Sequence, residues 1–215
     1  MRELATRTAV GIILILIALS SAVLGGWPFA ILVAAVATIM YLEWWRIVGR
    51  WGLAWKLYGF VYCLLPALSL LWIRERAEYS EIGLGFDLLI WVFLVVWSTD
   101  IGAFFAGRTI GGPKLAPSIS PNKTIAGLIG GVIAATILAG FWVYAVKLPA
   151  MLLWLAVPLA VSAQLGDLFE SGLKRRANVK DSGTWLPGHG GLLDRLDGLV
   201  PVAVLTAALM VAGWL

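Results

Sequence analysis

The chain alternates between long apolar runs and short polar connections. The apolar runs cover about residues 9–25, 27–43, 57–73, 86–107, 124–146, 149–170 and 198–215. A helix of about 20 apolar residues crosses the hydrocarbon core of a bilayer, where every backbone group must be satisfied within the helix. The pattern therefore predicts an all-α integral membrane protein with about seven transmembrane helices.

Composition supports this class. Hydrophobic residues make up 61% of the chain and charged residues 13%, whereas soluble domains carry about 25% charged residues. Arg2 and Arg7 precede the first apolar run as in a signal peptide, but no small-residue cleavage site follows, so we expect a retained first span. Without a linker or repeat, we expect one polytopic domain over 1–215, with N-terminal helices in about 1–85 and a catalytic part in about 86–215.

The basic residues predict an orientation. Of the 16 lysines and arginines, 13 lie before the first run or in the loops after the second, fourth and sixth runs. The opposite connections hold only Arg74, Arg76 and Lys147. Basic residues favour the cytoplasmic side. We therefore expect a multi-pass protein of the cell inner (plasma) membrane, with a cytoplasmic N-terminus and with loops 44–56, 108–123 and 171–197 in the cytoplasm.

Charge is concentrated in residues 166–198, which hold five of the twelve acids and the single histidine. Asp167 closes an apolar run, a position where a carboxylate is costly and usually functional. Glu170, Ser171 and Lys174 follow at helical spacing and should share its face. Such a face suits both a metal ion and a phosphate. The alternative is a solvated loop that is charged for solubility alone.

Two further features of this window suggest chemistry. Asp194 and Asp197, three residues apart, can converge on one side of a helix, and hard cations such as Mg²⁺ prefer carboxylate oxygens. Arg195 between them can bind phosphate or balance the acids, although acids also favour an ordinary helix start. The glycines around His189 leave backbone N–H groups bare to cradle phosphates, although a lone histidine is more often structural.

Other segments outside the window point the same way. Residues 111–127 form a loop whose lysines and hydroxyls suit phosphate, although a flexible loop would have a similar composition. Asp100 interrupts the fourth run and should face the interior or pair with another helix. Gly127, Gly130 and Gly131 are best explained by close helix packing. Magnesium, phosphate-binding bases and a membrane setting together favour phosphoryl or nucleotidyl transfer, which needs positioning and charge neutralisation.

A family resemblance sharpens this hypothesis. Ser171-x-Leu-Lys-Arg, Lys180-Asp-x-Gly and Leu186-Pro-x-His-Gly-Gly-Leu-x-Asp-Arg-Leu-Asp197 resemble the signature of phosphatidate cytidylyltransferases, also called CDP-diacylglycerol synthases. The match is continuous over residues 171–197. Lys114-Leu-x-Pro-x-Ile-Ser-Pro-x-Lys-Thr124 resembles a second motif of that family. The resemblance covers the C-terminal half, and the chain is short for the bacterial enzymes of this family.

The resemblance implies a reaction and roles for residues. Phosphatidate and CTP would give CDP-diacylglycerol and pyrophosphate, with Mg²⁺ held by Asp167, Asp194 and Asp197 and with room for a second cation. Lys174 and Arg195 would join these acids as catalytic residues. The residues implied in substrate binding are Asn122, Lys123, Thr124, Ser171, Arg175, Lys180, Asp181, His189, Gly190 and Gly191. The resemblance also implies a homodimer, with no nucleic-acid partner and with the active site at the cytoplasmic ends of the C-terminal helices.

Three alternatives stay open. A CDP-archaeol synthase would use another lipid, and the signature does not distinguish acyl from isoprenoid chains. A CTP-dependent lipid or polyprenol kinase would release CDP instead of pyrophosphate. A transporter or a structural membrane protein would bind lipid headgroups without turning over a nucleotide, although a transporter would more often place its charges at the membrane midplane.

Overall fold

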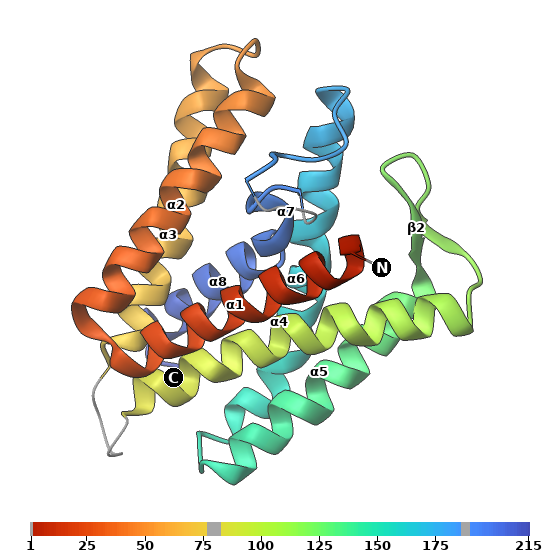
Figure 1. Ribbon diagram of the computed structural model, residues 1–215. Helices are drawn as coiled ribbons and strands as arrows, with labels where there is room; N and C mark the ends of the chain where they lie inside the picture. The colour runs from red at the N-terminus through yellow and green to blue at the C-terminus, as the bar shows by residue number, and fades with distance from the viewer. Residues whose placement is uncertain (1, 77–82, 186–189) are drawn as a thin grey trace.

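The computed structural model describes residues 2–76, 83–185 and 190–215. Helices dominate the described chain, and one small hairpin interrupts them (Figure 1). In chain order the elements are α1 (Arg2–Leu24), α2 (Gly26–Val48), α3 (Leu53–Arg74), α4 (Leu84–Thr109), β1 (Lys114–Ala116), β2 (Ser120–Thr124), α5 (Ile125–Ala145), α6 (Met151–Arg176), α7 (Leu193–Leu196) and α8 (Leu199–Val211).

The helices fall where the apolar runs predict them. Within the described residues, the five helices α2 to α6 are long and apolar enough to cross a membrane. The apolar stretches Thr8–Leu24 in α1 and Leu199–Val211 in α8 are shorter. Thirteen helical residues such as those of α8 rise about 20 Å, less than the ~30 Å hydrocarbon core. The helical membrane class is confirmed, and the count of seven spans stays a prediction.

Large apolar side chains cover much of the outer surface. Phe141 is 71% exposed, Trp154 80% and Trp27 81%, whereas a soluble monomer rarely exposes wide apolar patches. The interior is built around α4, whose Leu89, Trp91 and Val95 are completely buried. This arrangement, apolar both inside and outside, is what a helical bundle needs when its solvent is lipid.

Small residues bring α4 and α5 into close contact. A Cβ atom added to Gly102 on α4 would lie 2.6 Å from the carbonyl oxygen of Gly130 on α5. A Cβ on Gly131 would lie 2.7 Å from the carbonyl oxygen of Thr99. Both distances are too short for real atoms, so the two backbones could not approach this closely with larger residues. The packing interpretation of Gly130 and Gly131 is confirmed.

The segment between α4 and α5 contains an antiparallel hairpin of β1 and β2, where we expected a loop in an otherwise all-α protein. Lys114 pairs with Thr124 across the hairpin. The Thr124 hydroxyl then accepts a hydrogen bond of 3.0 Å from Gly127 N and caps α5. The hairpin, the α2–α3 turn and the C-terminal end of α6 lie toward one end of the molecule, at the top of Figure 1. This placement agrees with the predicted alternation of loops.

Candidate active site

The C-terminal end of α6 presents one polar face. Ser171 Oγ donates a hydrogen bond of 3.2 Å to Asp167 Oδ1, one turn earlier. Lys174 Nζ lies 3.0 Å from Glu170 Oε1, again one turn apart, and Glu170 is completely buried. The expectation that these four residues share a face is confirmed, because each contact joins positions four apart on a continuous helix.

The β hairpin contributes a lysine to this face. Lys123 Nζ lies 2.7 Å from Asp167 Oδ2 and donates to the carbonyl oxygen of Gln164 at 3.3 Å. Arg175 Nε donates to the carbonyl oxygen of Ile119, also in the hairpin, at 3.3 Å. Two segments that are about 45 residues apart in the chain are therefore docked at the predicted phosphate-binding region. The sequence predicted Lys123 for substrate but not its pairing with Asp167.

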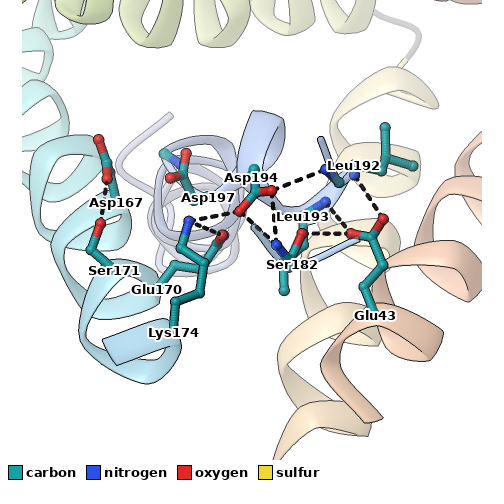
Figure 2. Close-up of polar contacts among 12 residues, drawn as sticks. Glu43, Asp167, Glu170, Ser171, Lys174, Ser182, Leu192, Leu193, Asp194 and Asp197 are labelled. Carbon is teal, nitrogen blue, oxygen red and sulfur yellow. Dashed lines mark hydrogen bonds and ion pairs between the residues drawn. The ribbon is translucent and has the colours of Figure 1, made fainter. Parts of the chain in front are cut away.

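Asp194 lies at the centre of the polar contacts in Figure 2. Its Oδ1 lies 2.6 Å from Lys174 Nζ, and its Oδ2 accepts hydrogen bonds from the backbone N–H groups of Ser182 at 2.9 Å and Gly191 at 3.0 Å. Ser182 N also lies 3.2 Å from Oδ1. A single carboxylate thus ties α6 to both sides of the loop that precedes α7.

Asp197 has a different environment although it lies only three residues further on. Its Oδ1 accepts a hydrogen bond of 2.7 Å from Gly198 N. Its electrostatic neighbours include the carboxylates of Asp167 and Asp100. Asp100, on α4, therefore belongs to the same charged region. Its position in the fourth apolar run predicted only a charge that faces inward or pairs with another helix.

The pKa values of the two signature acids differ. Burial acts to raise the pKa of Asp194, but its interactions with Glu170, Lys174 and the N–H groups of Ser182 and Gly191 outweigh burial and lower it to about 2. Burial raises the pKa of Asp197 to about 8, and the nearby charge of Asp167 adds to the effect. A carboxylate with a raised pKa gains from a positive ion beside it, because the ion favours the charged form.

The three acids predicted as metal ligands lie in one region but do not form a closed cage. Within residues 2–76, 83–185 and 190–215, no three His, Cys, Asp or Glu side chains are close enough to hold a metal ion together. The ammonium groups of Lys123 and Lys174 stand against Asp167 and Asp194. The donors nevertheless fit Mg²⁺ chemically, since all are carboxylates, and Mg²⁺ usually takes one or two of these together with water and substrate phosphates.

The remaining predicted residues are spread around this centre. Asn122, Arg175, Lys180 and Asp181 are exposed, whereas Thr124 is buried as the cap of α5. Gly190 has a left-handed φ of 81°, which favours glycine at this point of the loop. His189 lies outside the described residues.

The structure adds one residue that the sequence analysis missed. Glu43, near the end of α2, is only 1% exposed. Its carboxylate accepts hydrogen bonds from Leu192 N at 3.0 Å, Leu193 N at 2.8 Å and Ser182 Oγ at 2.9 Å. Figure 2 shows it facing the signature loop from the side opposite to α6. Glu43 stands at the end of an apolar run, as Asp167 does. This position was the available sequence signal, but only Asp167 was predicted from it.

An apolar cavity of about 140 Å³ lies beside the site. Its walls come from α1, α2, α3, α4 and α8, with Phe29, Ala37, Met40 and Phe93 among them. Arg195 also lines it and carries the only charge among the described residues that do so. The signature therefore borders a compartment that suits hydrocarbon.

Comparison with known proteins gives a consistent result. The model of the Cytidylyltransferase family matches residues 59–212. A phosphatidate cytidylyltransferase of Brucella suis is 46% identical over 178 residues, which cover 81% of this chain and 62% of that protein. The enzyme of the same name from Bacillus subtilis is 46% identical over 131 residues (60% and 47%), and that of Rickettsia bellii 36% over 184 residues (81% and 77%). The chain thus spans a little under two thirds of the Brucella relative.

Proposed function

Because the chain belongs to the cytidylyltransferase family, we propose that it transfers the cytidylyl group of CTP to phosphatidate, giving CDP-diacylglycerol and pyrophosphate for phospholipid synthesis. A phosphate oxygen of the lipid attacks the α-phosphorus of CTP. The bond from that phosphorus to the oxygen bridging to the β-phosphate breaks, and pyrophosphate leaves with the electron pair. No side chain needs to be a nucleophile, so the protein must position the phosphates and balance their charge.

One observation carries the proposal. Lys123, Lys174 and the backbone of the signature loop converge on the acids Asp167 and Asp194 from three separate parts of the chain. Preorganised donors aimed at developing phosphate charge are a large source of catalysis. The lysines that neutralise these acids are suitably placed to turn to a triphosphate when a cation balances the carboxylates.

The acids Asp167, Asp194 and Asp197 are our candidates to hold Mg²⁺, and a second cation is part of the proposal. Bound there, Mg²⁺ would neutralise charge on the phosphates. Asp197 is the best candidate of the three, because burial and the neighbouring carboxylates of Asp167 and Asp100 raise its pKa, and a cation would offset the charge of these acids. Arg195 and Lys174 would balance the remaining negative charge of the two substrates.

The apolar cavity supports a lipid acceptor. The cavity lies among α1, α2, α3, α4 and α8, and Arg195 lines it beside apolar side chains such as Met40 and Phe93. A phosphate on Arg195 would leave the lipid chains to pack in the apolar part. The cavity does not discriminate acyl from isoprenoid chains, so an archaeol phosphate is the nearest alternative substrate.

The membrane setting of the proposal follows from the basic residues. We propose the inner membrane, with a cytoplasmic N-terminus and with the site on the cytoplasmic face, where CTP is available. The preference of basic loops for the cytoplasm supports this orientation. A homodimer and the absence of a nucleic-acid partner complete the proposal.

The decisive experiment uses the purified full chain in detergent with phosphatidate, Mg²⁺ and CTP labelled at either the α- or the γ-phosphate. We expect the α-label in the lipid and the γ-label in pyrophosphate. A γ-label in the lipid, with CDP released, would establish a CTP-dependent kinase instead. Specific binding of lipid without turnover of either label would favour a transporter or a structural protein.

A further inference from the structure

Glu43 stands apart from the acids discussed so far, because it comes from α2 in the N-terminal half and outside the segment matched by the family model. Its side chain is 1% exposed and lies among apolar helices. A buried charge of this kind is costly unless hydrogen bonds compensate it. Both of its oxygens are compensated here, so its function should be sought in the groups that it binds.

These groups all belong to the signature. Oε1 accepts from Leu192 N, and Oε2 accepts from Leu193 N and from Ser182 Oγ. Leu192 and Leu193 immediately precede Asp194 and Arg195. Ser182 in turn donates its backbone N–H to Asp194. The Glu43 carboxylate thus binds the loop on both of its sides, at Ser182 and at Leu192 and Leu193. Asp194 and Arg195, which follow directly, are two of the proposed catalytic residues.

The fit around the carboxylate is tight. A Cβ added to Gly191 would lie 2.6 Å from Glu43 Oε2, and one added to Gly183 would overlap the same carboxylate. The glycines at these positions leave room for the buried acid. The loop therefore approaches α2 as closely as its backbone allows.

The helix that carries Glu43 is itself fixed at this level. The adjacent Trp44 is completely buried, and its Nε1 donates to the carbonyl oxygen of Trp55 at 2.9 Å. Trp44 also packs on Tyr62 of α3, with ring centroids 4.9 Å apart. A carboxylate on such a rigid element can define the position of a loop that has little regular secondary structure.

We propose that Glu43 is a positioning residue, whose buried carboxylate on α2 binds the Ser182 hydroxyl and the backbone N–H groups of Leu192 and Leu193 and thereby sets the place of Asp194 and Arg195 for the reaction. The inference rests on the proposed function for its kinetic part. Residues that orient the groups around a site typically change activity by about 10- to 100-fold when removed.

Glu43→Gln is the sharpest test. Glutamine keeps the size and one carbonyl oxygen but presents an NH₂ group, which cannot accept from the second backbone N–H. We expect kcat per folded protein to fall by about 10- to 100-fold, with a nearly unchanged KM for CTP. Amide hydrogen exchange should accelerate in peptides covering 190–197 and stay unchanged in α4 and α5, because loosening one segment raises the exchange rates of that segment only.

Two variants provide the controls. Asp87→Asn makes the same acid-to-amide change in the first turn of α4, 13 residues or about 20 Å along the helix from Asp100, and should leave kcat and exchange unchanged. Ser182→Ala removes only one of the three hydrogen bonds and should give a smaller loss. If Glu43 and Ser182 act through the same loop, the double variant should be little worse than Glu43→Gln alone, whereas two independent structural defects would multiply.

Each outcome decides between support and rejection. Wild-type kcat and wild-type exchange at 190–197 in Glu43→Gln would overturn the proposal. If Glu43→Gln does not fold, Ser182→Ala decides: a lower kcat and faster local exchange support the proposal, and no change in either rejects it. Failure of the wild-type protein to label lipid from CTP would instead reject the proposed function. The exchange measurements need no substrate, so they would still test whether Glu43 holds the loop.

Discussion

Lys123 Nζ lies 2.7 Å from Asp167 Oδ2, so an ion pair joins the β hairpin to α6 at the centre of the proposed site. The two side chains are 16% and 33% exposed, which gives a nucleotide access to the lysine. We infer that Lys123 exchanges the carboxylate for a triphosphate when CTP and a cation bind.

Lys123→Met should therefore weaken use of CTP. We expect kcat/KM for CTP to fall by about tenfold or more, because a charge-assisted contact to phosphate is lost. Lys123→Arg should retain part of the activity, since it keeps the charge but changes the geometry. Lys147→Met, in the exposed α5–α6 connection, is the matched control for steady-state kinetics. Equal kinetics in the two methionine variants would contradict the role.

The acids should differ in their response to Mg²⁺. We expect Asp167→Asn, Asp194→Asn and Asp197→Asn each to reduce turnover strongly without loss of folding. Raising Mg²⁺ should partly restore Asp197→Asn, because weaker metal binding is offset by concentration. It should not restore Asp194→Asn, whose oxygens also accept from Lys174, Ser182 and Gly191.

Asp181→Asn is the contrast for this series. Asp181 is exposed in the middle of the signature loop, so we expect an effect on substrate handling that Mg²⁺ does not change. Activity titrated against Mg²⁺ checks all four variants. Near-normal activity of the three main variants at limiting Mg²⁺ would refute the metal assignment.

Protein stability in the absence of divalent cations should depend on pH through Asp197. Its pKa is raised to about 8 in the folded protein, against about 3.9 for an unperturbed aspartate. The folded state therefore binds the proton more tightly, and the stability that this gives is complete below about pH 4 and lost as the pH rises toward 8. Melting temperatures in detergent should fall over this range in the wild type.

Asp197→Asn cannot titrate and should show a flatter dependence of melting temperature on pH. Mg²⁺ should oppose the fall in the wild type, because a cation favours the ionised carboxylate. An identical slope in the wild type and in Asp197→Asn would show that another group is responsible.

The orientation can be tested by labelling single cysteines in intact cells. In a Cys63→Ser background, we expect Thr184→Cys, in the signature loop, to be protected from an impermeant thiol reagent. Ala150→Cys, in the α5–α6 connection, should react. Both positions are exposed, so burial does not explain a difference. Labelling of Thr184→Cys from outside, in folded protein, would reverse the proposed topology.

The apolar cavity should influence lipid use. Ala37 on α2 lines this cavity of about 140 Å³. The larger side chain of Ala37→Leu should fill part of the cavity and raise the KM for long-chain phosphatidate more than the KM for a short-chain form. Ala35→Leu, on the exposed face of the same helix, is the control. Equal effects of both variants on the two lipids would remove the cavity from the lipid site.

The sequence predicted the helices and the charged region well, for local reasons. Apolar runs of membrane length allow essentially one backbone solution, and Asp167, Ser171 and Lys174 follow a helical period. The spacing of Asp194 and Asp197 was less informative. It predicted neither environment: Asp194, in the single turn of α7, accepts a hydrogen bond from Gly191 N, and Asp197, just after that turn, has Asp167 and Asp100 as electrostatic neighbours. That both acids hold one cation stays a prediction.

The features that the sequence did not predict arise from contacts between segments that are distant in the chain. The hairpin of β1 and β2 is too short to produce a clear alternating pattern, and the pairing of Lys123 with Asp167 follows from its docking on α6. Glu43 stands at the end of an apolar run, like Asp167, but its partners are backbone N–H groups. No residue type in the signature indicates a backbone donor, so the spacing of side chains could not reveal this partner.

The contacts of Glu43 also constrain the order in which the protein can be assembled. Glu43 is separated by 149 residues from Leu192 and by 150 from Leu193. During synthesis, earlier segments enter the membrane first, so α2 must be inserted with an acid that has none of these three partners yet. The ribosome must add roughly 150 more residues before the hydrogen bonds of Glu43 with Leu192 and Leu193 can form. Asp194 and Asp197 thus reach their places late in biogenesis, and a ribosome that stalls after α6 would leave a helical bundle without either acid.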